Sequence, residues 1–172
     1  MFSTLKNAFK IKEIRGKLLF TFLMLVVIRF GSQLPIPGVN RDYFASWFEA
    51  QTGGAFNFFD AFTGGSFSRM SVFALNITPY ITSSIIMQLL TIAIPKLEEM
   101  QKDGEDGRKK IASITRYVTI ALALIESAAM AIGFGNQGLL QKYGPLEIIT
   151  VVAVLTAGSA FLMWIGERIT EK

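Results

Sequence analysis

The residue best placed to do chemistry is Glu126, a carboxylate in the middle of an otherwise apolar run at 117–135. An ionised residue at the centre of a membrane-spanning helix costs about 2.5–3.5 kcal/mol, and the leucine, isoleucine and valine residues around it only about balance this cost. We therefore expect Glu126 to face the interior of a helix bundle or water. Two interpretations are open: a protonated carboxyl group bonded to a neighbouring helix, or a functional polar site.

Catalytic chemistry is strongly restricted by composition. The 172 residues include no histidine and no cysteine. Disulfides, thiol catalysis, Cys/His zinc sites and catalytic triads that need a histidine are therefore excluded. Since the sequence also shows no nucleophile beside a base and no metal-ligating cluster, we expect neither an enzyme nor a cofactor.

The composition is typical of an integral membrane protein. The chain is 51% hydrophobic and only 17% charged, whereas a soluble domain has about a quarter of its residues charged. Its net charge of +4 could suggest nucleic-acid binding, but the charged residues lie between long apolar runs. We expect a lipid bilayer as the surroundings and no direct sequence-specific contact with nucleic acid.

Four segments are candidates for membrane spans, each of about 20 mostly apolar residues. The second and fourth contain uncharged runs at 72–94 and 148–165, and the third is interrupted only by Glu126. The first has an unbroken apolar run only as far as Ile28, and its basic flank also resembles a secretory signal peptide. Because no small-residue cleavage site follows, we prefer an uncleaved helix whose Arg29 reaches the far interface.

Lysine and arginine positions predict the orientation of these spans. The N-terminal segment carries five such residues and the loop at 95–116 carries six, whereas segments 34–71 and 138–145 carry two and one. Cytoplasmic loops are enriched in Lys and Arg, so we expect both termini and the loop at 95–116 in the cytoplasm. Within that loop, Arg108, Lys109 and Lys110 form either a solvated turn or a docking surface for a cytoplasmic partner.

The segment at 55–71 does not fit a simple helix bundle. It is rich in phenylalanine, interrupted by Gly64 and Gly65, and too short to cross a bilayer. A re-entrant element beside a water-filled cavity fits this pattern. An amphipathic helix on the outer membrane surface fits it equally well.

The second span contains an isoleucine stripe, because Ile77, Ile81 and Ile85 recur every four residues. Such a stripe usually contacts lipid or another helix, but beside the polar Gln88 it could also form the hydrophobic constriction of a pore. Pro79 lies within this span, and we expect it to bend the helix.

Several ordered motifs resemble the SecY family, the central subunits of the bacterial protein-translocation channel. They are KEIRGKLLF at 12–20, LPIPGV at 34–39, FALNITPYITSSIIMQLL at 73–90, GRKKI at 107–111 and FLMWIGERIT at 161–170. One local departure is Asn76, where the family usually has glycine. The resemblance covers essentially the whole chain.

This resemblance implies a channel rather than a catalyst. It implies a pore ring with Ile77 and Ile81, and a lateral gate with Ile85, Gln88 and Glu126. The segment after the first helix would be the plug that closes the outer funnel. Its residues would include Phe58, Phe59, Phe62, Gly64, Gly65, Phe67 and Arg69.

The resemblance also implies partners and a location. The expected partners are the SecE and SecG subunits, SecA or the ribosome, signal sequences and nascent chains, in the bacterial cytoplasmic (inner) membrane. Since the family has ten transmembrane helices, we expect an N-terminal piece that cannot close a pore alone. An alternative is that the chain is itself an insertion client of the ribosome, translocon or insertion chaperones. A weaker one is a secondary transporter using Glu126 as a proton site.

We therefore predict an all-α integral membrane protein with four transmembrane helices and a short re-entrant plug helix. Both termini are expected in the cytoplasm. The predicted segments are a cytoplasmic N-terminal amphipathic part at 1–17, spans at 18–37, 72–94, 117–135 and 146–166, a plug at 55–71, a cytoplasmic loop at 95–116 and a cytoplasmic end at 167–172.

Overall fold

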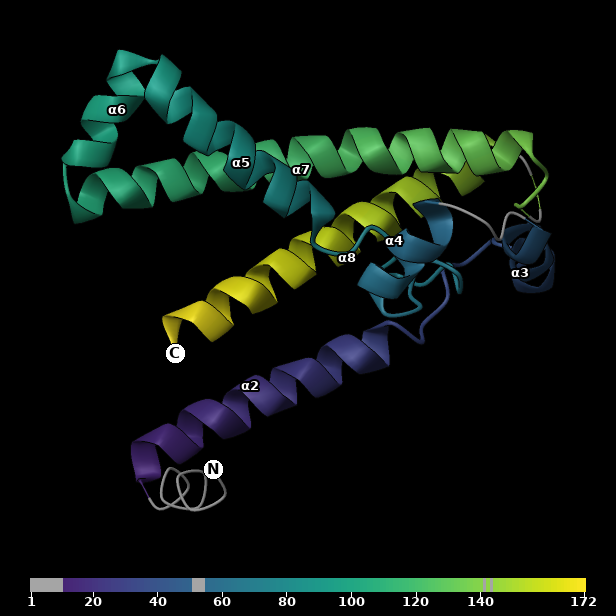
Figure 1. The fold of residues 1–172 in the computed structure, drawn as a ribbon. Coiled ribbons are helices and arrows are strands. Elements are labelled where there is room, and N and C mark those ends of the chain that lie inside the picture. Colours follow the sequence, from purple (N-terminus) through teal and green to yellow (C-terminus); the bar gives the residue numbers. More distant parts are fainter. Residues whose placement is uncertain (1–10, 51–54, 141, 143) are drawn as a thin grey trace.

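The structure, a computed structural model, describes residues 11–50, 55–140, 142 and 144–172, and within them the chain is helical (Figure 1). The only β-type pairings in the described residues are two isolated bridges, which confirms the all-α class. The helices are α2 (Lys12–Gly31), α3 (Arg41–Ala50), α4 (Ala55–Thr63), α5 (Thr78–Ala93), α6 (Pro95–Lys102), α7 (Glu105–Asn136) and α8 (Pro145–Glu171).

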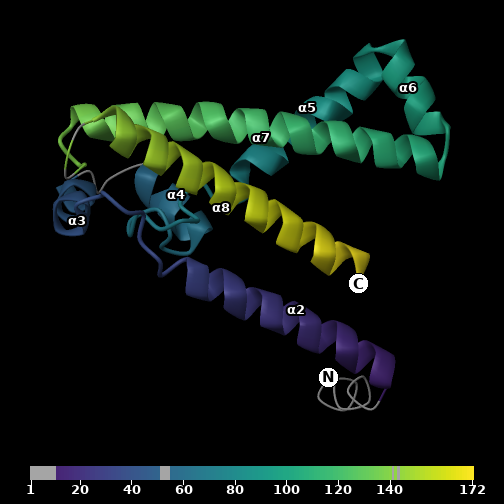
Figure 2. The same ribbon diagram turned by 180° about the vertical axis from the view of Figure 1, so that it is seen from behind.

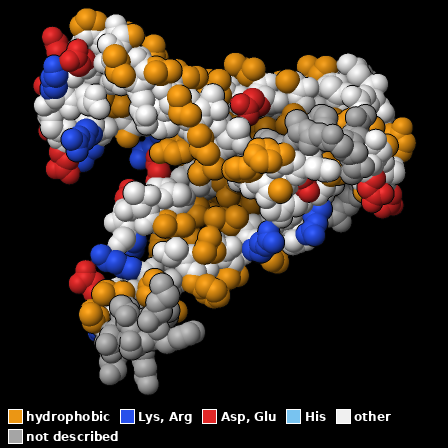
Figure 3. Space-filling view, in the orientation of Figure 1, with side chains coloured by type: hydrophobic (Ala, Val, Ile, Leu, Met, Phe, Trp, Pro, Cys, Tyr) orange, Lys and Arg blue, Asp and Glu red, His pale blue; other side chains and the backbone are white. Residues whose placement is uncertain are grey.

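Two of these helices, α7 and α8, are long and apolar enough to cross a membrane. The pair α5 and α6 would make a third if the two helices form one span, although they are bent by 102° at their junction. Hydrophobic side chains cover much of the middle of the molecule in Figure 3, and one group of charged side chains lies around α6. The described residues thus contain two or three candidate spans.

Pro79 does not bend a helix, so that prediction is wrong. The helix α5 begins only at Thr78, and Pro79 lies in its first turn, where proline costs no hydrogen bond. The residues from Val72 to Ile77 form turns instead. The sharp bend lies at Ile94, an extended residue between α5 and α6 that is followed by Pro95 in the first turn of α6.

The helix α2 ends at Gly31, before the two prolines that follow it. The segment after α2 then pairs with the segment before α5. The Val72 amide donates to the Leu34 carbonyl at 2.9 Å, and the Ile36 amide donates to the Met70 carbonyl at 3.0 Å. The predicted N-terminal segment at 1–17 falls mostly on residues 1–10, which lie outside the described part of the chain.

Small side chains mediate the main helix contacts. The helix α7 packs against both α5 and α8, and its buried residues include a stripe at every fourth position. These are Thr115, Thr119, Ala123, Ser127 and Ala131. Small and hydroxylated residues let membrane helices approach closely, because lipid gives helices no hydrophobic reason to associate.

The hydrophobic core lies at one end of the bundle. There, α3 lies beside the turn between α7 and α8 (Figure 2), and residues of the turns after α4 pack with both. The ring of Phe44 lies edge-on to the rings of Phe67 and Phe134, with centroids 6.0 and 5.3 Å apart. The core residues are Ile36, Val39, Phe44, Phe48, Phe67, Met70, Ala74, Leu75, Ala131, Phe134, Leu139, Leu140, Val151 and Leu155.

Candidate functional site

The helix α5 has one buried face and one exposed face. Its buried residues are Pro79, Ser83, Met87 and Thr91, which lie four residues apart and therefore form one stripe. Its exposed face carries large apolar side chains, with exposed fractions of 51% for Ile81, 53% for Ile85, 62% for Leu89 and 81% for Ile92. One apolar side of α5 is therefore not covered by the described residues.

Polar groups on the buried face of α5 are satisfied by nearby backbone. The Ser83 hydroxyl donates to the Thr115 carbonyl on α7 at 2.8 Å. The Thr91 hydroxyl lies 2.7 Å from the Met87 carbonyl one turn earlier. Among the described residues, no buried side-chain polar atom lacks a hydrogen-bond partner. This face is thus a structural contact.

The predicted pore and gate isoleucines do not share one environment. Ile81 and Ile85 lie on the exposed face of α5. Ile77 precedes the helix as its N-cap and is half-buried against α8, where a β-carbon on Gly166 would lie 3.5 Å from the Ile77 Cδ1 atom. The three isoleucines are in register along the helix, since the Ile81 amide donates to the Ile77 carbonyl at 3.1 Å, but only Ile81 and Ile85 are exposed.

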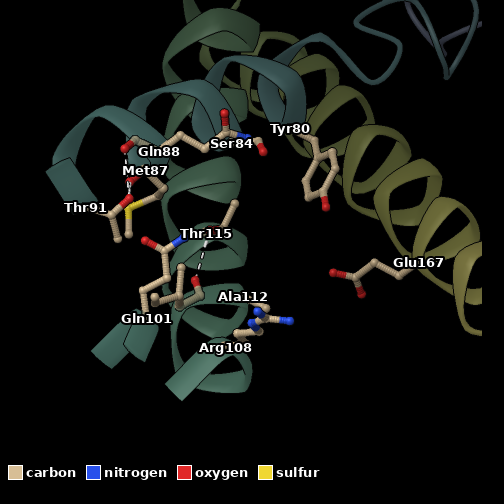
Figure 4. A pocket seen from close by; sticks show the side chains of 11 residues that line it. Tyr80, Ser84, Met87, Gln88, Thr91, Gln101, Arg108, Ala112, Thr115 and Glu167 are labelled. Carbon is tan, nitrogen blue, oxygen red and sulfur yellow. Dashed lines mark hydrogen bonds between the residues drawn. The ribbon is translucent and has the colours of Figure 1, made fainter. Parts of the chain in front are cut away.

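A cleft of about 340 Å³ lies between α5, α6, α7 and α8. Figure 4 shows Gln88 and Ser84 on α5, Arg108 and Thr115 on α7, and Glu167 on α8 around it. The lining residues are Tyr80, Ser84, Met87, Gln88, Thr91, Gln101, Arg108, Ile111, Ala112, Thr115 and Glu167. Hydroxyl, amide and charged groups thus converge on one polar hollow.

An ion pair at this cleft joins α7 to α8. The Arg116 Nε atom lies 2.7 Å from a Glu167 carboxylate oxygen, and the Glu167 side chain is only 20% exposed. The sequence alone did not identify this pair, because its partners are 51 residues apart. Their only signal was opposite charge at the predicted ends of two neighbouring spans.

We expect the Arg116–Glu167 pair to contribute a measurable coupling energy. In a double-mutant cycle with Arg116→Ala and Glu167→Ala, the free energy of unfolding in detergent should show a coupling of about 0.5–1 kcal/mol, because the pair is close and partly buried. The Lys109–Glu105 pair, 3.8 Å apart and exposed, is the control and should show almost none. Additive effects of the two changes at Arg116 and Glu167 would contradict this role.

Glu126 lies half-buried on α7, between the exposed Ile125 and the buried Ser127. The Ser127 and Thr156 hydroxyls are 3.1 Å apart across the contact of α7 with α8. The Ser83–Thr115 bond joins α5 to α7 between these two residues. Gln88 lies on the side of the bond nearer α6, and Glu126 lies on the side nearer the turn between α7 and α8. Gln88 lies five residues beyond Ser83 on α5, and Glu126 lies eleven residues beyond Thr115 on α7, so the two predicted gate residues lie on opposite sides of that bond.

The segment at 55–71 forms the short helix α4 followed by a series of turns. Phe58 and Phe62 point outward, with exposed fractions of 69% and 72%, whereas Phe67 is buried in the core. Gly64 and Gly65 adopt φ values of +63° and +80°, in the left-handed region that favours glycine. The side chain of Phe59 lies outside the described part of the structure.

Two arginines connect this segment to α2 and to the residues after it. The Arg29 guanidinium donates to the Gly64 carbonyl at 2.9 Å, a contact that the sequence did not predict. The Arg69 guanidinium donates to the Gln33 side chain at 2.6 Å. The role of Arg29 was hidden in the sequence because it joins residues 35 positions apart.

The predicted basic contact residues lie in the first turns of α7. Arg108, Lys109 and Lys110 are all exposed, and Arg108 also lines the cleft. In the residues that the structure describes, no group of three or more acidic side chains could hold a metal ion.

Fold and cleft together define a helical membrane protein whose helices pack through small residues. The family model named SecY matches residues 71–172. A protein translocase subunit SecY from Halalkalibacterium halodurans is 46% identical, covering 100% of this chain and 40% of that protein. The subunits named SecY from Bacillus subtilis and Pseudomonas aeruginosa are 45% and 43% identical, covering 99% and 94% of this chain and 40% and 37% of those proteins.

The chain belongs to the SecY family. It spans about 40% of the length of the curated relatives it matches most fully.

Proposed function

We propose that this chain forms one wall of a protein-conducting channel in the bacterial cytoplasmic membrane. The observation that carries this proposal is the exposed isoleucine face of α5, with Ile81 and Ile85 both about half exposed. An apolar face that is not covered by the chain's own helices can form a hydrophobic constriction together with other channel segments. The names of the relatives, protein translocase subunit, support this role.

In this proposal α4 and the following turns act as the plug. The segment is short and held at the end of the bundle by side-chain bonds from α2, while Phe58 and Phe62 remain exposed. Its packing is uneven, because Phe67 and Met70 are buried in the core while the outer face of α4 is exposed, so we expect α4 to be displaced more easily than the turns that follow it. Ile77 and Ile81 would contribute to the pore ring beside it.

Ile85, Gln88 and Glu126 are the proposed residues of a lateral gate. Because Gln88 and Glu126 lie on opposite sides of the Ser83–Thr115 bond, they would act at two separate levels of that gate. Ile85 and Gln88 would contact an apolar signal segment near the cleft. Glu126 would face such a segment nearer the α7–α8 turn.

The proposed topology has four spans, with α2 as the first and both termini in the cytoplasm. It is supported by the placement of the beginning of α2, the α6–α7 turn and the C-terminus toward one end of the molecule (Figure 1). Arg108, Lys109 and Lys110 at that end would contact SecA or the ribosome. SecE and SecG would be the membrane partners.

Photo-crosslinking tests the channel proposal. A photoreactive side chain at Ile81 or Ile85, in membranes carrying a stalled secretory precursor, should form an adduct with the precursor, because these positions face the proposed path. Ile149 on α8 is the matched control, since its side chain is 64% exposed but lies on another helix. The adducts are quantified by gel electrophoresis and mass spectrometry.

Equal adduct yields at Ile81, Ile85 and Ile149 would contradict the assignment of α5 to the path. The family match gives no support to the alternative that the chain is an insertion client. If the chain were an insertion client, the precursor would give no adduct at either isoleucine, and ribosomal or chaperone proteins would be crosslinked instead.

A further inference from the structure

The C-terminal end of α4 depends on a side chain from outside its own turn. The last four carbonyls of a helix have no partner within the helix. The chain after α4 satisfies three of them: Gly65 bonds to Asp60 at 3.0 Å, Gly64 to Ala61 at 3.2 Å, and Ser66 to Thr63 at 3.4 Å, each through a backbone amide. The fourth, the Phe62 carbonyl, accepts the side-chain amide of Asn76 at 3.4 Å.

The backbone at Asn76 does not itself require this side chain. Its φ is +53°, in the left-handed region where glycine is the least strained residue and asparagine is tolerated. Asparagine therefore keeps a conformation that glycine would adopt more easily. What asparagine adds at this position, compared with glycine, is the bond from its side chain to α4.

Asn76 is also fixed on its other side. Its carbonyl accepts the Ser159 hydroxyl on α8 at 3.2 Å, and the next residue, Ile77, is the N-cap of α5. The residue therefore connects three elements: the end of α4, the beginning of α5 and the middle of α8. Moving α4 away from this position requires breaking the bond from Asn76 to Phe62.

We propose that Asn76 is a latch that holds α4 against the beginning of α5, with Ser159 anchoring the latch to α8. The bond from Arg29 to the Gly64 carbonyl restrains the same end of α4 from the side of α2. The latch deepens the proposed function, since a restrained α4 affects translocation only if α4 is the plug. Its existence is a property of this chain that can be measured without any translocating substrate.

A cysteine-accessibility experiment tests the latch. The chain has no cysteine, and Ser66 is only 3% exposed, so Ser66→Cys reports opening of the α4 turn through its rate of labelling by a maleimide. In lipid bilayers, Asn76→Gly should raise this rate about fivefold, the effect of losing one hydrogen bond. Asn76→Asp, whose carboxylate cannot donate, should raise it by a similar factor.

Ser83→Cys is the matched probe, because Ser83 is fully buried and bonds to α7 rather than to α4. Its labelling rate should not change in either Asn76 variant. The proposal is overturned by unchanged labelling at Ser66→Cys, by an equal rise at Ser83→Cys, or by a rise in the glycine variant alone, which would reflect backbone flexibility. Because no precursor is present, failure here leaves the crosslinking test of the channel unaffected.

Discussion

Replacing Gly158 with leucine is expected to destabilise the chain by about 2–3 kcal/mol. Gly158 is buried in α8, and a β-carbon there would overlap the carbonyl oxygen of Val72. Overpacking typically costs about 1–3 kcal/mol, and the upper part applies here because the obstacle is backbone rather than a flexible side chain. The free energy of unfolding, measured in detergent by circular dichroism, checks this.

Gly133→Leu provides the control for Gly158→Leu. Gly133 lies in α7, and a β-carbon there would meet no atom within 4 Å. The same enlargement should therefore not destabilise the chain, and the better helix propensity of leucine should raise the free energy of unfolding by up to about 1 kcal/mol. If the two variants lost equal stability, the close approach of α8 to the Val72 backbone would be contradicted.

Replacing Gly107 with alanine is expected to open the hairpin between α6 and α7. Gly107 is buried in the first turn of α7, and a β-carbon there would overlap the Met100 carbonyl oxygen on α6. The two helices would have to separate, which would also displace Gln101 and Arg108 from the polar cleft. Trypsin should then cleave after the exposed Lys102 about fivefold faster, as expected for a local loss of about 1 kcal/mol.

Gly133→Ala is the matched substitution for this second experiment. Alanine is better than glycine inside a helix by roughly 0.5–1 kcal/mol, so this variant should be neutral or slightly more resistant to trypsin. Faster trypsin cleavage in Gly107→Ala together with slower cleavage in Gly133→Ala would show that the effect comes from the contact between Gly107 and α6. Faster cleavage in both variants would instead indicate a general loss of helix stability and would contradict the hairpin contact.

The conformation of Asn76 explains how it can stand where the resemblance predicts glycine. The residue lies at a φ of +53°, a region that glycine occupies freely and asparagine tolerates. The departure therefore preserves the backbone path between Phe73 and Ile77. What it adds is a side-chain donor for the end of α4.

The sequence by itself determined the class of protein, the family and two candidate spans. The apolar runs that became α7 and α8 are long enough to cross a bilayer, and hydrophobicity over some 20 residues is a property of the local sequence. The motif at 73–90 likewise identified the family that the comparisons confirm. Both inferences needed no knowledge of which helices touch.

The tertiary structure alone decided the contacts between distant residues. Pro79 can bend a helix or stand in its first turn, and the pairing of the residues before it with the segment after α2 accompanies its place in the first turn of α5. Arg29 bonds to the α4 turn and Arg116 bonds to Glu167, over separations that leave no periodic signal in the sequence. Local sequence fixes the period and length of an element, whereas the partner of a polar side chain depends on how the elements pack.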